Sequence, residues 1–277
     1  MSDAFSSSPP VTDFVVDVSE AEERFFADNG YLAIECVTTQ VELDWLREVY
    51  DVLIARPRSG FLDTVFDLAR PYGSTAEPSL GQLLFPERLV PAVRETAMWQ
   101  NAKRIATRLL AVAQHEVESW GHLLFKAAEH GSETPWHQDE AYWDINLDYH
   151  AVGAWMPLYD VNVDNGCLWF LPGSHRREVL PHRHLGDDAN VHVLELNVDA
   201  DVSEAVAVPL KAGGMSFHHP RMLHHARANV TSSIRRAWAN EYQTVPVERD
   251  RLADRPWVTE GHRALAESLE RSKSQKS

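Results

Sequence analysis

The sequence predicts a mainly β protein in which a double-stranded β-helix, or jelly roll, packs against N-terminal helices. After about residue 116, short apolar runs recur between turn residues, a pattern typical of an antiparallel sandwich or barrel. Before that point, apolar residues recur at helical spacing. The chain has 277 residues, of which 44% are hydrophobic and 24% charged. It is therefore long enough for one sizeable core and has an average globular composition.

The first expected elements are a short helix and a strand. Ser19 and Glu22 have the spacing of a capping box, and Asn29-Gly30 is a helix stop signal. A helix is therefore expected between these signals. The apolar run at residues 31–34 then predicts a strand.

Two longer helices complete the predicted helical layer. One begins at Thr39, with a glutamate three residues later, and ends at Pro57. The next lies within about 91–112, where apolar residues at helical spacing alternate with charged ones. The segment 59–82 is rich in Gly and Pro and predicts a loop with short helical turns.

The strands of the jelly roll are expected at the apolar runs that follow. Turn signals at 164–166, 172–174 and 213–214 bracket them as sheet corners would. The expected strands lie at residues 123–128, 152–159, 167–171, 191–196, 205–210, 215–218 and 238–245.

These elements predict a single domain between two tails. Residues 1–18 are expected to form a flexible tail, and residues 261–277 a flexible or helical one. The domain covers 19–260, with a helical layer at about 19–115 and the jelly-roll core at about 116–246.

Composition narrows the classes of partner. The net charge is −15, which repels phosphate backbones, so nucleic-acid binding is not expected. Cys36 and Cys167 are too few for a disulfide framework, and no basic leader or long apolar span is present. We expect a cytoplasmic protein that acts on a small molecule, without membrane insertion, while its oligomeric state leaves no trace in the sequence.

A possible metal site begins with His137-Gln138-Asp139. In an extended segment, residues two apart project to the same face, so His137 and Asp139 can reach one metal ion. A third ligand is available in segment 217–225, which contains four histidines. Two histidines and a carboxylate suit non-haem Fe(II). The His-x-Asp pair alone is weak evidence for a metal site, because the same residues commonly form a hydrogen-bonded turn.

Three blocks resemble the phytanoyl-CoA dioxygenase family of Fe(II)- and 2-oxoglutarate-dependent oxygenases. The first is Pro-Trp-His-Gln-Asp at 135–139, and the second is Asn-Gly-Cys-Leu-Trp-Phe-Leu-Pro-Gly-Ser-His at 165–175, after Trp155. In the third, His224 is followed by Asn229 and by Arg235, eleven residues after His224. The resemblance covers residues 20 to 245 and implies a cupin-like jelly-roll core.

The resemblance implies a role for individual residues. The implied iron ligands are His137, Asp139 and His224. Arg235 would pair with the distal carboxylate of 2-oxoglutarate, a task for which a planar guanidinium is suited. The other implied cosubstrate contacts are Gln138 and Trp155, with Leu123 and Phe125 as an apolar wall.

The implied reaction consumes O2 and 2-oxoglutarate and hydroxylates an unactivated C–H bond, releasing succinate and CO2. Related halogenases carry Ala or Gly where this chain has Asp139, so halogenation is not expected. The substrate is a small organic molecule: an acyl-CoA, an amino acid or a secondary metabolite. The net charge of −15 weakens the acyl-CoA alternative. Desaturation, epoxidation and ring rearrangement share the same cofactors and stay open.

Adjacent residues are alternatives to His224 as the third metal ligand and to Arg235 as the cosubstrate-binding residue. His225 follows His224 where the family often has Gly-Ser, so it is an alternative ligand, although an extended segment would point it the other way. His218 and His219 are expected to pack beside the site. Arg236 is expected to be solvated or salt-bridged.

Further aromatic and histidine residues have two readings each. Tyr142 and Trp143 either contact substrate or belong to the core. His182, His184 and His192 are expected to be solvated loop residues rather than a second metal site.

Two rival functions remain. One is a non-catalytic jelly-roll module that binds metal or 2-oxoglutarate as a sensor or interaction protein. The other is a zinc hydrolase, which no His-Glu-x-x-His helix supports.

Overall fold

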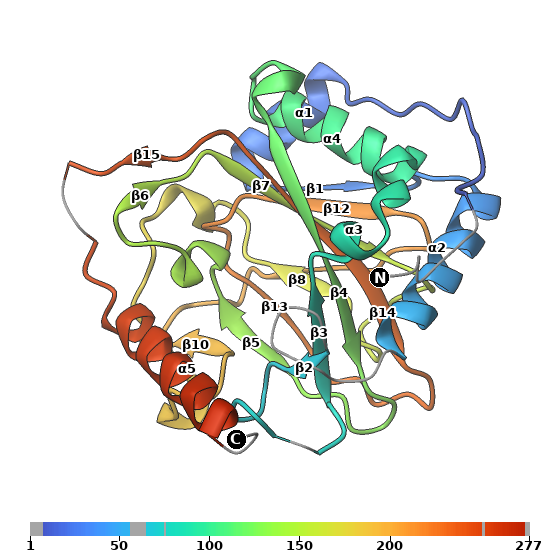
Figure 1. Cartoon of the computed structure of the whole chain (residues 1–277). Coiled ribbons are helices and arrows are strands. Elements are labelled where there is room, and N and C mark those ends of the chain that lie inside the picture. Colours follow the sequence, from blue (N-terminus) through green and yellow to red (C-terminus); the bar gives the residue numbers. More distant parts are fainter. Residues whose placement is uncertain (1–7, 56–64, 75, 251–252, 275–277) are drawn as a thin grey trace.

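Two antiparallel sheets face each other at the centre of the molecule (Figure 1). The computed structural model describes residues 8–55, 65–74, 76–250 and 253–274. The larger sheet has, in order, β1 (Tyr31–Ile34), β12 (Met215–His218), β7 (Ala151–Pro157), β14 (Arg235–Gln243), β4 (Glu118–Lys126), β3 (Leu80–Leu84) and β2 (Phe66–Asp67). The smaller sheet has β11 (Val206–Val208), β8 (Leu168–Phe170), β13 (His224–Ala226) and β5 (Thr134–His137). This arrangement confirms the predicted jelly roll.

Two short ladders extend the sheets at one end of the molecule. In the first, β10 pairs with β9, and in the second, β15 pairs with β6. Their bounds are β6 (Leu147–Asp148), β9 (His182–His184), β10 (Leu194–Leu196) and β15 (Val247–Glu248).

The first two helices start where the sequence predicts them. Ser19 and Glu22 form the capping box of the first helix, and Gly30 ends it with φ 81°, a left-handed conformation that favours glycine. Thr39 caps the second, whose last residue precedes Pro57, a residue outside the described ranges. The helices are α1 (Glu20–Asn29), α2 (Gln40–Ile54), α3 (Pro86–Leu89), α4 (Ala97–Leu109) and α5 (Pro256–Ser274).

Helices α2 and α4 cover the outer face of the large sheet (Figure 1). Leu46 and Ile105 pack in one core with Leu123 and Trp238 of the sheet. Glu42 connects the two helices: it is fully buried, and its carboxylate accepts the backbone N–H groups of Ala97 at 2.6 Å and Met98 at 3.0 Å. A carboxylate at these positions satisfies unpaired donors at the start of α4.

The predicted loop at 59–82 contains sheet instead. Its residues 59–64 lie outside the described ranges, but β2 and the start of β3 continue the large sheet beyond β4. Gly81 faces Phe125 across β3 and β4, and a Cβ at this position would overlap the Phe125 ring. Glycine is thus required by close packing, although it weakens the strand signal in the sequence.

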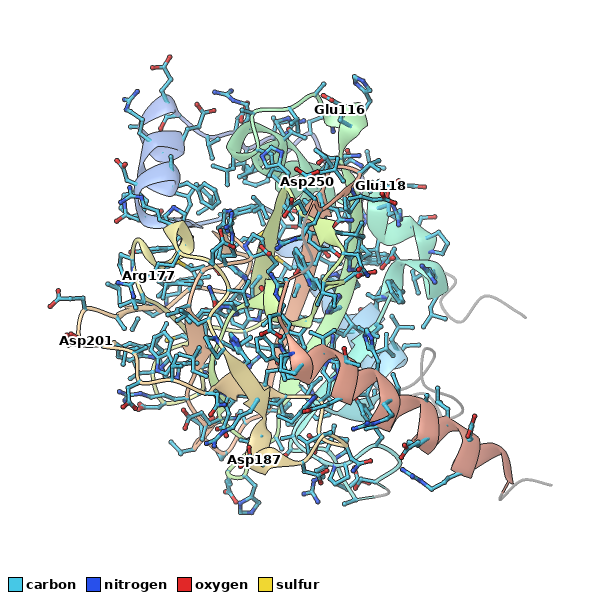
Figure 2. The ribbon with its side chains drawn as sticks, turned by 90° about the vertical axis from the view of Figure 1, so that its left-hand side faces the viewer. Glu116, Glu118, Arg177, Asp187, Asp201 and Asp250 are labelled. Carbon is cyan, nitrogen blue, oxygen red and sulfur yellow. The ribbon has the colours of Figure 1, made fainter. Side chains whose placement is uncertain are left out.

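Several charged side chains mark the outer surface of the molecule. Glu116, Glu118, Arg177 and Asp201 are exposed and project outward in Figure 2. Within the described residues, no helix has the length and apolar character needed to cross a membrane.

Candidate metal centre

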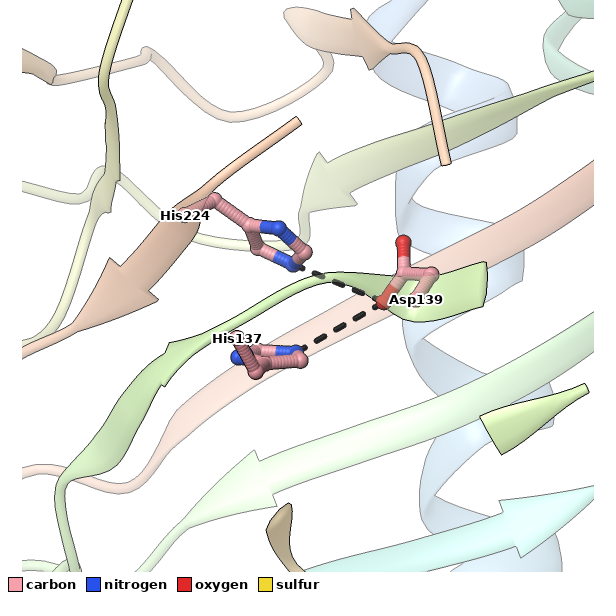
Figure 3. Close-up of side chains that lie close together, drawn as sticks. All are labelled: His137, Asp139 and His224. Atoms are coloured by element: carbon pink, nitrogen blue, oxygen red, sulfur yellow. Dashed lines mark ion pairs between the residues drawn. The ribbon is translucent and has the colours of Figure 1, made fainter. Parts of the chain in front are cut away.

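His137, Asp139 and His224 meet at one point between the two sheets (Figure 3). His137 ends β5 and His224 begins the adjacent strand β13, where the two residues pair directly. Gln138 is extended, with φ −124° and ψ 132°, and therefore returns Asp139 to the same side as His137. The Nε2 atoms of His137 and His224 each lie 3.6 Å from Asp139 Oδ1.

Hydrogen bonds to carbonyl groups decide which nitrogen each histidine presents. His137 Nδ1 donates to Pro135 O at 2.8 Å, and His224 Nδ1 donates to Met222 O at 3.0 Å. A carbonyl oxygen only accepts, so in both neutral rings the proton is on Nδ1. Both Nε2 lone pairs then face Asp139 Oδ1, and the three atoms are arranged as ligands for one divalent ion.

The second oxygen of Asp139 is engaged by another histidine. His218 Nε2 donates to Asp139 Oδ2 at 2.8 Å, which leaves Oδ1 for a metal. Gly153 lies opposite His218 in the sheet, and a Cβ there would be 2.8 Å from His218 Nε2. Gly153 therefore leaves the space that His218 needs.

The environment favours the metal-binding protonation states of Asp139 and His224. Burial would raise the pKa of Asp139, but the three neighbouring histidines, His224, His137 and His218, hold this pKa well below its ordinary value. Burial lowers the pKa of His224 to about 3. An ionised carboxylate and a neutral imidazole are the forms that ligate metals.

A cavity of about 620 Å³ contains these ligands. Arg235, the first residue of β14, lines this cavity. Aromatic residues, histidines and residues of α5 form much of the remaining wall. Along β14, Ala239 and Glu241 line the cavity on the same face as Arg235. The metal ligands thus share a cavity with one buried arginine.

Arg235 is prepared to bind an anion. It is 5% exposed, and its Nε and Nη1 atoms are buried without a hydrogen-bond partner among the described residues. Its guanidinium carbon lies 5.3 Å from the centre of the Trp155 ring. Burial lowers the pKa of Arg235 to about 10, so it is charged at neutral pH. Two unpaired donors of a planar cation match a carboxylate.

A family model described as "Phytanoyl-CoA dioxygenase (PhyH)" matches residues 26–237, most of the chain. The chain belongs to the phytanoyl-CoA dioxygenase family. It is 24% identical over 236 residues to a probable phytanoyl-CoA dioxygenase of Caenorhabditis elegans, covering 81% of this chain and 75% of that protein.

A second curated protein and a solved structure give further matches. Phytanoyl-CoA dioxygenase 1 of Oryza sativa subsp. japonica is 30% identical over 114 residues, which cover 41% of this chain and 40% of the rice protein. The crystal structure of EvdO2 from Micromonospora carbonacea var. aurantiaca complexed with 2-oxoglutarate matches with a TM-score of 0.78 and 33% identity. That match covers 89% of this chain and 99% of EvdO2.

Two predicted wall residues of the phytanoyl-CoA dioxygenase motif point elsewhere. Leu123 and Phe125 pack on the outer, helix-covered side of the sheet, and the residues of β4 that line the cavity include His122 and Leu124. The prediction that Leu123 and Phe125 line the pocket is therefore wrong. Alternation along a strand reverses the face when the register is misjudged by one residue.

Gln138 also faces away from the cavity. Its Nε2 donates to Arg221 O at 2.7 Å, and its Oε1 accepts Leu180 N–H at 2.8 Å. Because His137 and Asp139 face the metal position, the residue between them projects to the other side. The structure places Gln138 as a brace for the chain around the site, contrary to its predicted lining role.

Tyr142 and Trp143 both line the cavity. The Tyr142 hydroxyl accepts Leu194 N–H at 2.8 Å, and its ring stacks on His192 at 5.2 Å. Tyr142 thus both packs against neighbouring residues and lines the cavity.

Neither alternative residue joins the metal group. His225 stacks on Trp136 at 4.3 Å and lies 3.6 Å from Glu133. Arg236 pairs with Asp51 at 3.6 Å, which confirms the salt bridge expected for it.

The three remaining predicted loop histidines are not a solvated group. His182 and His184 are 3% and 7% exposed, which corrects the expectation. His182 Nε2 accepts a hydrogen bond from the backbone N–H of Gln138 at 3.2 Å, and this bond helps to fix the backbone between His137 and Asp139. His192 lines the cavity and contacts the Tyr72 hydroxyl at 3.1 Å.

Some residues of the site were not predicted from the sequence. Lys126 is fully buried beside Arg235 in the paired strand, and it donates to Ser132 O and, at 2.9 Å, to Thr134 Oγ1. Glu241 and the α5 residues in the wall were also missed. The alternation of Arg235, Ala237, Ala239 and Glu241 along one face would have revealed Glu241.

Proposed function

We propose that this protein is an Fe(II)- and 2-oxoglutarate-dependent oxygenase that hydroxylates an unactivated C–H bond of a small organic substrate. In the proposed reaction, one oxygen atom of O2 enters the substrate as a hydroxyl group and the other enters succinate. The 2-oxoglutarate loses CO2 and supplies the two electrons that balance the reaction. Bound iron would supply the activation of O2.

The observation that carries this proposal is the joint presence of the metal triad and an unpaired buried arginine in one cavity. His137, Asp139 and His224 would hold the iron through Nε2, Oδ1 and Nε2. Three protein ligands leave open positions on an octahedral ion for a keto acid and O2. Arg235 would hold the distal carboxylate through its free Nε and Nη1 donors.

Hydroxylation agrees with the residues present better than halogenation does. A halide needs a coordination position that no protein carboxylate fills. Asp139 occupies that position, and His218 fixes its second oxygen. We therefore retain hydroxylation within the wider class of iron- and 2-oxoglutarate-dependent reactions.

A non-catalytic binding module is the second candidate function. The cavity continues past the metal ligands into a wall built from β3, β4 and α5, which offers space for a substrate in addition to the cosubstrate. A sensor that binds 2-oxoglutarate alone has no need for this space. The observation favours an enzyme.

A cytoplasmic location completes the proposal. Cys36 is an exposed free thiol and Cys167 a buried one. Free thiols persist in a reducing compartment. Fractionation of cells that produce the protein tests this location.

An anaerobic titration of the metal-free protein tests the proposed site. Fe(II) is added first and 2-oxoglutarate second, and the visible metal-to-ligand charge-transfer band of the chelated keto acid is followed. We expect a saturable band that Asp139→Ala abolishes and His225→Ala preserves. Absence of the band in folded protein would contradict the proposal.

Turnover is tested separately by admitting isotope-labelled O2. Succinate production, followed by transfer of one labelled atom to a metabolite, is the expected result. A protein that forms the charge-transfer band but yields no succinate with any metabolite pool would be the binding module instead.

A further inference from the structure

The cavity beyond the metal ligands has a distinct chemical character. Aromatic side chains form much of its wall, and Arg235 at the cosubstrate end is the one Lys or Arg among the described lining residues. Among the described residues, no other lysine or arginine lines the cavity. Apart from Trp155, which lies beside Arg235, the aromatic lining residues are Phe66, Tyr72, Phe85, Trp120, Tyr142, Trp143 and Trp257.

Glu241 contributes an unpaired carboxyl oxygen to the cavity wall. It lies on β14 between Trp120 of β4 and Gly153 of β7, its direct neighbours in the sheet. Its side chain lines the cavity, and its Oε2 is buried without a hydrogen-bond partner among the described residues. Leaving a buried carboxyl oxygen unpaired is costly, so such a group in a ligand cavity indicates a missing partner.

Two pairs of polar residues in the cavity wall are already hydrogen-bonded to each other. His122 Nδ1 bonds to Gln82 Nε2 at 2.7 Å, and His192 Nδ1 bonds to the Tyr72 hydroxyl at 3.1 Å. Burial lowers the pKa of both histidines to about 4, so both are neutral at neutral pH. They carry no charge that would attract an anion or balance Glu241.

Resting on the proposed function, we propose that this end of the cavity binds an uncharged, hydroxyl-bearing ring compound whose hydroxyl group hydrogen-bonds to Glu241. Aromatic walls suit the faces of a ring. A hydroxyl group both donates and accepts, so it pairs with Glu241 whether that carboxyl group is ionised or protonated. A substrate with an anionic group at this position would meet a carboxyl group and no cation, which excludes it.

Three probes of one shape distinguish the possible ligand classes: 2-indanol, indane-2-carboxylate and 2-aminoindane. Each is titrated calorimetrically, under anaerobic conditions, into the full-length protein loaded with Fe(II) and 2-oxoglutarate. We expect 2-indanol to bind at least about 10-fold more tightly than the carboxylate, since one buried hydrogen bond corresponds to roughly this factor.

Two substitutions at one position then identify the interaction. Glu241→Gln keeps a donor and an acceptor, so its affinity for 2-indanol should stay within about threefold of wild type. Glu241→Leu removes both and should weaken binding by about tenfold. The matched controls Glu118→Gln and Glu118→Leu alter an exposed glutamate on the neighbouring strand and should change nothing.

Several results would overturn the inference. Tightest binding of 2-aminoindane, with Glu241→Gln as damaging as Glu241→Leu, would show an ammonium site. Tightest binding of the carboxylate would show an anion site, and failure of all three probes would show that a ring does not enter. The charge-transfer band in the same samples reports the iron and 2-oxoglutarate site, so its persistence would confine the failure to the substrate class.

Discussion

Single hydrogen bonds determine what the metal ligands can do. The carbonyl groups of Pro135 and Met222 hold the Nδ1 protons of His137 and His224, so each ring presents Nε2 to the ion. The two oxygens of Asp139 also have separate roles, because Oδ2 accepts a hydrogen bond from His218 and Oδ1 is left for the metal. Ligand orientation is thus present in the protein before metal arrives.

The ligand assignment predicts a contrast between adjacent histidines. Asp139→Ala and His224→Ala should each abolish iron retention after desalting, because two remaining ligands bind too weakly. His225→Ala should retain iron, since His225 stacks on Trp136 outside the metal group. Metal analysis of the purified variants measures this, and retention by His224→Ala with loss in His225→Ala would reverse the assignment.

Adjacent arginines provide a second contrast. Arg235→Lys should weaken 2-oxoglutarate binding by about 10- to 100-fold, because an ammonium group cannot reproduce a two-point contact with a carboxylate. Arg236→Lys should leave the affinity within about twofold, since Arg236 pairs with Asp51 on the other face. Titration of the charge-transfer band gives both affinities. Equal losses would show that the facing of the two arginines is misassigned.

At the scale of elements, strand alternation explains which predictions held. The His-x-Asp pair needed only the period of two, which the extended Gln138 satisfies. The prediction for Leu123 and Phe125 chose the wrong face of the strand. All residues at 123–125 are apolar, so hydrophobicity does not show which of them face the cavity. β3 was missed because Gly81, required by the Phe125 ring, resembles a loop residue.

The link between α2 and α4 predicts a large effect on stability. Glu42→Ala should lower the free energy of unfolding by about 3 kcal/mol, because it leaves the buried N–H groups of Ala97 and Met98 without acceptors. Asp44→Ala, on the exposed side of α2, should cost less than about 1 kcal/mol. Urea unfolding of the metal-free proteins measures both values. A small change for Glu42→Ala would show that water replaces the carboxylate.

At the scale of the molecule, the cavity joins segments that are far apart in the sequence. Its lining includes Phe66 from β2, Trp120 from β4 and Trp257 from α5. The local sequence pattern of each segment can predict a helix or a strand, but it does not predict which segments lie next to one another in the folded protein. The fold class and the metal triad could be predicted from the sequence, whereas the substrate wall required tertiary structure.

The unpaired Glu241 also predicts the pH dependence of stability. Burial raises the pKa of Glu241 well above its ordinary value of 4.5, with Asp139 adding to this effect. The folded protein therefore holds a proton that the unfolded chain releases, and stability is lost as the pH rises through this range. Glu241→Gln should stabilise the metal-free protein more at about pH 7 than at about pH 4.

Urea unfolding at both pH values measures this difference between the two proteins. Glu118→Gln is the control, because its exposed side chain should show no such trend. A stabilisation by Glu241→Gln that is equal at both pH values would mean that the carboxyl group is hydrated in the folded state.

Because Arg235 and Glu241 lie on the same strand, β14 fixes the distance between these two polar residues of the cavity. The two residues stand six positions apart, about 20 Å along an extended strand. Because β4 and β7 pair with β14 on both sides, this spacing cannot stretch. A larger or smaller substrate therefore has to be accommodated by the opposite wall. Remodelling α5 would change substrate size while the distance between the two anchors is conserved.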